Sequence, residues 1–365
     1  MRFLPLVALL AACGSNNVGV SALGSGAHDA SLLRLTTLAT ADDGLATPTD
    51  VSINPNQPGT LWVTNYAENR ITVYDGSSWN IHDGPGSNHF LASPMALSFS
   101  DSGEFATAHD TDDLTQGNAT PADFMGPTLW DDTSNFDGGH AGHLDMLHNT
   151  PLGGGVAWET ERVYWLFDGY HSSLTRYNFN EDHGYGGSDH TDGEIDRYVE
   201  GEVSRIEGIP SHLDFDAASG LLFAADTANG RIAVLDTTTG ERGGTIGPNY
   251  DGGRMNEVEG AEIFTLADGG NLEIALDDNG NEMSDPTTLE QPAGLELDGD
   301  ILYVTDHATS RILALDAIDG TLMDWVELDY PAGTLGGIEV DADGSLLVTL
   351  MNENTLVRIT TEEAQ

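Results

Sequence analysis

One pattern of apolar and polar residues recurs along the chain, and it predicts the architecture. Its clearest copy begins at Pro210 and contains three short strand-like runs, at 210–216, 221–226 and 231–236, separated by turns rich in Gly, Asn and Asp. Apolar runs of this length between turn residues are typical of β-strands. The same phrase returns from Pro48 and from Pro292. A repeated meander that cannot bury both of its faces must stack against its copies, so the pattern predicts an all-β propeller.

The number of blades follows from the starts of the innermost strands, at Pro48, Pro94, Pro151, Pro210, Pro292 and near Gly336. The spacing between them is uneven, which predicts insertions at 110–150, 180–208 and 241–291. The last gap could hold a seventh blade, since 261–266 and 271–276 resemble a hairpin. That hairpin lacks the proline start and the Asp…Arg turn. We therefore predict six blades and interpret the hairpin as an extension.

The two ends of the chain should close the ring. The run 355–359 is only the third strand of its blade, and six residues follow it. An unpaired strand edge invites association with other chains, and propellers avoid it by closing the ring. The segment Ser31–Thr37 has no partner in the repeat count. We expect it to form the fourth strand of the last blade.

The turn after the second strand carries a family resemblance. An Asp or Asn precedes an Arg-Ile pair by five residues in three copies: Asp226…Arg231, Asp306…Arg311 and Asn65…Arg70. This repeated motif resembles that of the NHL family of six-bladed propellers, and the resemblance covers nearly the whole of 31–365. The mechanics imply structural turn pairs, with each Arg opening the third strand close to the preceding carboxylate. A propeller fold by itself specifies no activity.

The N-terminus reads as an export signal. Residues 1–12 form a signal peptide whose apolar run is too short to span a bilayer. Leu10-Ala-Ala-Cys13 resembles the bacterial lipobox, in which the cysteine becomes acylated. Cys13 is the only cysteine, so no intramolecular disulfide can form. We predict a flexible tether at 13–30, a propeller domain at 31–365, and a location in the bacterial cell envelope, with the lipid on Cys13 as the sole membrane contact.

The composition excludes some partners. The formal charge is −48 and every basic residue is an arginine. Such a surface repels nucleic acid and anionic headgroups, so we expect neither as a partner. High salt would screen its self-repulsion, which favours a marine or halophilic exported protein. A surface loaded with calcium is the alternative, although the acidic segment 277–282 lacks the ligand spacing of an EF-hand loop.

Several histidines have metal-ligand spacing. His143, Asp145 and His148 lie in one glycine-rich segment, and His212 could converge on them from the next inner strand. Imidazole with one carboxylate suits zinc, copper or iron. Propeller topology would put this segment at the mouth of the channel, and would put the loop 182–192, with His183 and His190, on the opposite face, where it could hold another cation. In both places solvated or backbone-bonded histidines are the alternative.

The blade at 209–241 is also similar to a blade of the peptidyl-hydroxyglycine amidating lyases. In those zinc propellers Pro-His pairs at the inner-strand starts supply ligands. Here Pro210 is followed by Ser211, and His212 is displaced by one position. A displacement of one residue on a strand turns the side chain to the other face. The sequence also has no Gly-x-Ser-x-Gly elbow, phosphate loop or dinucleotide fingerprint, so no catalytic residue is assigned.

We therefore predict a monomeric, lipid-anchored, extracytoplasmic propeller that acts as a binding or scaffold protein. A small molecule, peptide or protein would bind at its face, with a divalent metal as the candidate cofactor. The alternative is a metal-dependent lyase or hydrolase that uses His143, His148 and His212.

Overall fold

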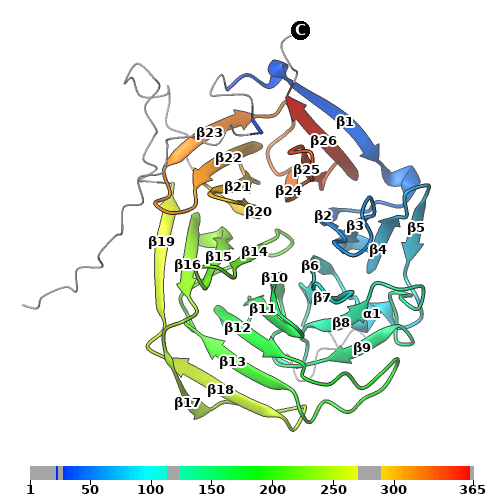
Figure 1. Ribbon diagram of the computed structural model, residues 1–365, viewed down its shortest axis with the longest axis vertical. Coiled ribbons are helices and arrows are strands. Elements are labelled where there is room, and N and C mark those ends of the chain that lie inside the picture. The colour runs from blue at the N-terminus through cyan, green and yellow to red at the C-terminus, as the bar shows by residue number, and fades with distance from the viewer. Residues whose placement is uncertain (1–21, 24–27, 113–122, 270–288, 362–365) are drawn as a thin grey trace, which may run out of the picture.

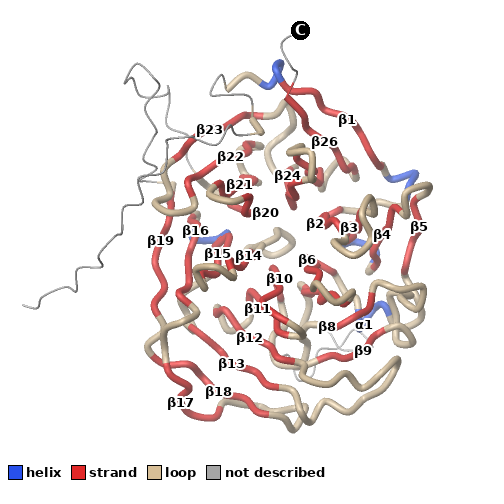
Figure 2. The backbone as a smooth tube through the Cα atoms, in the orientation of Figure 1, coloured by secondary structure: helices blue, strands red, loops and turns tan. Residues whose placement is uncertain are grey.

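The protein forms a closed ring of six β-sheet blades (Figures 1 and 2), and a small cavity lined by the innermost strands forms its central channel. This computed structural model describes residues 22–23, 28–112, 123–269 and 289–361. The predicted six-bladed, all-β propeller is confirmed. The expected signal peptide at 1–12, the lipidated Cys13 and the run 271–276 lie outside the described residues. Within the described part, no helix is long and apolar enough to cross a membrane.

The first three blades follow one another in chain order. Blade 1 consists of β2 (Pro48–Ile53), β3 (Leu61–Asn65), β4 (Arg70–Tyr74) and β5 (Trp79–His82). Blade 2 consists of β6 (Pro94–Phe99), β7 (Glu104–His109), β8 (Thr128–Asp131) and β9 (His143–Met146). Blade 3 consists of β10 (Gly153–Thr160), β11 (Val163–Asp168), β12 (Ser173–Asn178) and β13 (Glu194–Tyr198), with β18 (Arg254–Glu259) and β17 (Glu241–Thr245) added outside.

The other three blades complete the ring. Blade 4 consists of β14 (Leu213–Asp216), β15 (Leu221–Asp226), β16 (Arg231–Asp236) and β19 (Glu262–Asp268). Blade 5 consists of β20 (Pro292–Asp298), β21 (Ile301–Asp306), β22 (Arg311–Asp316) and β23 (Leu322–Glu327). Blade 6 consists of β24 (Leu335–Val340), β25 (Leu346–Leu350), β26 (Thr355–Thr361) and β1 (Leu33–Ala39). The described helices are short: α1 (Ser87–Phe90) and the 3₁₀ turns Ala30–Leu32, Ala41–Asp43, Tyr66–Glu68 and Thr227–Asn229.

The N-terminal strand closes the ring, as the sequence predicts. β1 runs antiparallel along the outer side of β26, with Leu33 opposite Thr361 and Ala39 opposite Leu356 (Figure 1). Leu33 and Ala39 are buried in the cores on either side of blade 6. Two segments more than 300 residues apart in the chain therefore share one sheet.

Each of the three predicted insertions contains strands that belong to the blades. The segment 110–150 supplies β8 and β9, the segment 180–208 supplies β13, and the segment 241–291 supplies β17, β18 and β19. Blade 2 therefore continues beyond His109, within the segment 110–150 that was predicted to be an insertion. The run 261–266 belongs to β19, the fourth strand of blade 4, so its interpretation as an extension is wrong.

The blade cores explain why these outer strands were missed. The second strand of a blade is buried along its whole length, as β11 and β21 show. It therefore reads as a continuous apolar run. An outer strand such as β5 or β19 is largely exposed or half-buried. Its sequence is accordingly mixed and carries little periodic signal.

The predicted turn pair is present in blade 4 and altered in blade 5. Arg231 donates from Nε to Asp226 Oδ2 at 2.6 Å. Arg311 stands opposite Asp306 but pairs instead with Glu327, with Nη2 and Oε2 2.9 Å apart. The carboxylate of Asp306 accepts backbone N–H groups from the preceding loop. Both arginines are thus structural partners, but only one of them partners the turn carboxylate.

Candidate metal centre

The outer strand of blade 2 presents two ligand-type side chains on one face. His143 and Asp145 are two residues apart on β9, and side chains at that spacing point the same way. Both residues are fully buried, at 1% and 0% exposure. A carboxylate without solvent needs partners, because burial of an unpaired charge is costly.

The partners come from the loop that joins β12 to β13 in blade 3. This loop reaches back over β9, where His183 N donates to Leu144 O at 3.2 Å and Gly186 N donates to His143 O at 3.0 Å. Gly187 lets the backbone wrap the His183 ring, since a Cβ on it would lie 2.7 Å from His183 Nδ1.

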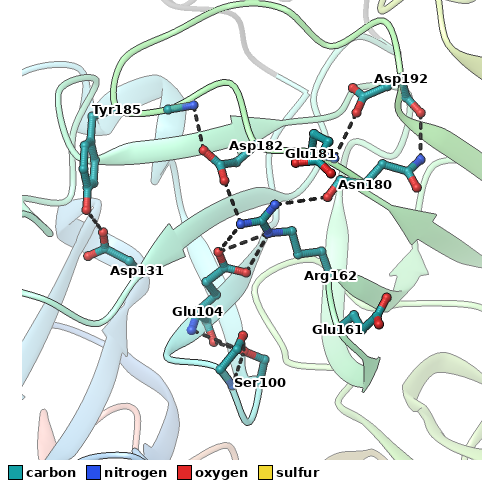
Figure 3. Close-up of polar contacts among 12 residues, drawn as sticks. Ser100, Glu104, Asp131, Glu161, Arg162, Asn180, Glu181, Asp182, Tyr185 and Asp192 are labelled. Carbon is teal, nitrogen blue, oxygen red and sulfur yellow. Dashed lines mark hydrogen bonds and ion pairs between the residues drawn. The ribbon is translucent and has the colours of Figure 1, made fainter.

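Ion pairs hold the base of the loop in place (Figure 3). Arg162 lies between Glu104 of blade 2 and Asp182 of the loop, with Nη2 2.7 Å from a carboxylate oxygen of each. Asn180 Nδ2 donates to Asp192 O at 2.8 Å and joins the two ends of the loop. Tyr185 donates its hydroxyl hydrogen to Asp131 of blade 2. The loop is thus fixed on blade 2 independently of its histidines.

Three potential ligand atoms from Asp145, His183 and His190 lie within 4.8 Å of one another. His190 Nδ1 and Asp145 Oδ1 are hydrogen-bonded at 2.7 Å. His183 Nε2 lies 3.8 Å from the same oxygen. Among the described residues, neither His183 Nε2 nor Asp145 Oδ2 has a hydrogen-bond partner, although both atoms are buried. Buried polar atoms are normally satisfied, so these two atoms, on side chains that offer ligand atoms within 4.8 Å of one another, are candidates for ligation of a cation.

The neighbouring histidines are oriented by bonds to their Nδ1 atoms. His183 Nδ1 bonds Gly184 O at 2.7 Å, and His143 Nδ1 bonds His140 O at 2.6 Å. His148 Nδ1 pairs with Asp251 Oδ1 at 2.5 Å. A hydrogen bond at Nδ1 leaves the lone pair of Nε2 available to bind a metal ion. Metal-binding histidines are usually oriented in this way by a hydrogen bond from their other ring nitrogen.

The local charges suit metal ligation. Burial lowers the pKa of His143 to about 4, so its imidazole is neutral at physiological pH. For His190, burial lowers the pKa, but the hydrogen bond and charge of Asp145, with Asp251 and Asp189, outweigh it and raise the pKa overall. Metal ligands must be deprotonated, so an ion here would displace the proton that His190 shares with Asp145.

His212 lies elsewhere, in the central channel. Its Nδ1 is 3.7 Å from Asp50 Oδ1, and Asp214, Glu296 and Glu339 line the same cavity. Burial, followed by repulsion from neighbouring carboxylates, raises the pKa of Glu296 and Glu339 well above the usual range. The cavity has a volume of about 80 Å³, far below the size of ordinary ligand pockets.

The predicted site residues lie in different groups from those expected from the sequence. His143, Asp145 and His148 lie on or just after the outer strand β9, so their placement at the channel mouth is wrong. The loop with His183 and His190 contacts that strand, so its placement on the opposite face is also wrong. His212 does not join them. The error arose because 110–150 was interpreted as a loop and not as strands β8 and β9.

Sequence reasoning missed Asp251 and the channel carboxylates. Asp251 reaches His148 from a turn 103 residues away, and nothing local in the chain indicates that contact. The channel acids had a usable signal. Asp214 and Glu296 each follow the proline at the start of their blade by four residues. Glu339 follows Leu335, the first residue of β24, by the same interval, and all three acids line the channel.

Comparison with known proteins supports the fold alone. No family model and no curated protein matches the chain. Among solved structures, an auxiliary nutrient binding protein from Bacteroides thetaiotaomicron has a TM-score of 0.58 at 10% identity, over 91% of this chain and 77% of that one. Its counterpart from Bacteroides ovatus has a TM-score of 0.56 at 12% identity, with coverage of 91% and 77%. A streptogramin B lyase has a TM-score of 0.53 at 13% identity, with coverage of 90% and 98%.

Proposed function

We propose that this protein is a lipid-anchored, extracytoplasmic binding propeller that holds a transition-metal ion on Asp145, His183 and His190. The observation that carries the metal is the pair of buried atoms, Asp145 Oδ2 and His183 Nε2, that lack hydrogen-bond partners beside a third ligand group. Two imidazoles and a carboxylate favour zinc, copper or iron over calcium or magnesium, which take oxygen ligands.

The binding role rests on the fold and its neighbours. The Bacteroides propellers named above are nutrient binding proteins, and they share this fold over most of both chains. The small channel volume argues against a ligand inside the ring, so the partner would bind on an outer face. The lipobox-like segment ending at Cys13 supports anchoring of the propeller to an envelope membrane.

The enzyme alternative receives no support from the geometry. It requires His143, His148 and His212 at one site, whereas His212 lines the channel and the other two lie at the rim. The lyase among the neighbours shares only 13% identity, which carries the fold but no activity.

Metal content of the full-length protein tests the proposal. The protein is stripped with chelator, incubated with zinc, passed through a desalting column and analysed by mass spectrometry for metal per chain. We expect one zinc per chain, and less than a tenth of that in His183→Ala. His171→Ala is the matched control, because His171 pairs with Asp168 in blade 3, away from the site. A wild-type protein without zinc, or equal zinc in both variants, would contradict the proposal.

A further inference from the structure

We infer that His143 supplies a fourth ligand, so that the ion is enclosed by three imidazoles and one carboxylate and has a structural role. This inference rests on the proposed function, since it describes the same ion. His143 has the right position, because it shares its strand face with Asp145. It also lies beside the loop ligands, with its ring centroid 4.9 Å from that of His183.

The spacing of the rings fits one shared ion. The rings of His183 and His190 are 5.1 Å apart, close to the separation of His143 and His183. Zinc–nitrogen bonds near 2 Å at tetrahedral angles put the centroids of two bound imidazoles about 5 Å apart. The spacing of these rings is therefore near the one that a tetrahedral ion requires.

The surroundings hold His143 in this orientation. Phe90 stacks on its ring at 4.1 Å, and Trp130 meets it edge-on at 6.5 Å. The bond from Nδ1 to His140 O leaves Nε2 as the free nitrogen. A ligand packed between aromatic rings loses little freedom on binding a metal, so the site is preorganised.

His148 is the competing fourth ligand, and the packing favours His143. The ring of His148 lies 5.5 Å from that of His190, but His148 comes after the end of β9. It is held by Asp251 and packed on Phe124 at 4.0 Å. It therefore belongs to a neighbouring pair that borders the site.

A metal site with four protein ligands would hold two blades together. Structural zinc sites fill all four positions with protein ligands, whereas catalytic sites keep one position for water or substrate. Here two ligands come from β9 of blade 2 and two from the loop of blade 3. The ion would join the two blades at the rim and hold the loop that Arg162 already anchors.

Cobalt(II) spectroscopy on the full-length protein tests this geometry, because tetrahedral cobalt absorbs visible light several-fold more strongly than five- or six-coordinate cobalt. We expect an intense band in the wild type and a several-fold weaker one in His143→Ala. His140→Ala is the matched control: its side chain is exposed, and the carbonyl that orients His143 remains. It should keep the full band, as should His148→Ala.

The outcomes separate the two proposals. A wild-type protein that binds no cobalt would refute the proposed function itself. Binding with a weak band that His143→Ala leaves unchanged would refute only the fourth ligand, as would loss of the band in His148→Ala alone. If His143→Ala fails to fold, zinc-edge absorption fine structure on the wild type decides. Three imidazole scatterers are expected, and two would overturn the inference.

Discussion

Removal of the N-terminal clasp should destabilise the whole ring and not only its terminus. Leu33 is 7% exposed at the start of β1, whereas the adjacent Leu32 is 45% exposed. Truncation of a buried leucine costs about 2–5 kcal/mol, because its contacts are lost and a cavity remains. We expect about 3 kcal/mol for Leu33→Ala and less than about 0.5 kcal/mol for the matched control Leu32→Ala.

Deletion of residues 31–37 should cost more than the point variant. It removes the backbone pairing of β1 with β26 and exposes that edge. Each net backbone hydrogen bond contributes about 1 kcal/mol. The total, about 5 kcal/mol or more, would be a large share of the 5–15 kcal/mol stability typical of folded proteins.

Amide hydrogen exchange at increasing urea, read on peptides from β11, measures the effect away from the clasp. The strand β11 of blade 3 is fully buried and lies far from β1 and β26 in the ring (Figure 1). A ring closed by β1 should unfold there at lower urea in both Leu33→Ala and the deletion variant. An unchanged midpoint for β11, with only the ends of the chain altered, would refute the reasoning.

Three further predictions concern single side chains. Asp226→Ala should lower the free energy of unfolding, measured by chemical denaturation, by about 3–5 kcal/mol, because it removes a fully buried carboxylate that bonds Arg231 and the turn. Asp298 is exposed, so the control Asp298→Ala should change this free energy little. Burial raises the pKa of Asp214 to about 6, so the folded state holds this proton more tightly and stability is lost as pH rises from about 4 to 6. Asp214→Asn should therefore gain about 1–2 kcal/mol over the wild type between pH 4 and pH 7, after discounting for its partly exposed position, and a constant difference would contradict this. Cys13→Ser should leave an unprocessed precursor without lipid, so normal mature mass in the detergent phase would refute the lipobox interpretation.

The inner strands could be predicted from the sequence because the physics of a propeller forces a simple pattern on them. A strand such as β21 is buried on both faces, so most of its residues are apolar, and the turn after it must carry residues that tolerate a tight bend. Closure of the ring by β1 could be predicted because the last blade had only three strands in the sequence and Ser31–Thr37 had no other partner. The outer strands had no such constraint, and β9, β13 and β19 were mistaken for parts of insertions.

The sequence predicted which residues could bind a metal, but it did not predict which of them lie together. His143 and Asp145 were recognised by their spacing, and His183 and His190 by their loop composition. Their convergence depends on a loop from blade 3 lying against the outer strand of blade 2, a contact made by backbone hydrogen bonds from His183 and Gly186. Such bonds are available to any residue, so no side-chain pattern in the sequence announces them.

The most direct test of the account is the position of the ion itself. Crystals of the full-length protein grown with zinc should give an anomalous difference peak about 2 Å from ligand atoms of Asp145, His183 and His190. We predict one such peak at the rim between blades 2 and 3. A zinc-bound crystal with no peak there, or with its peak among Asp214 and Glu296 in the channel, would contradict the account.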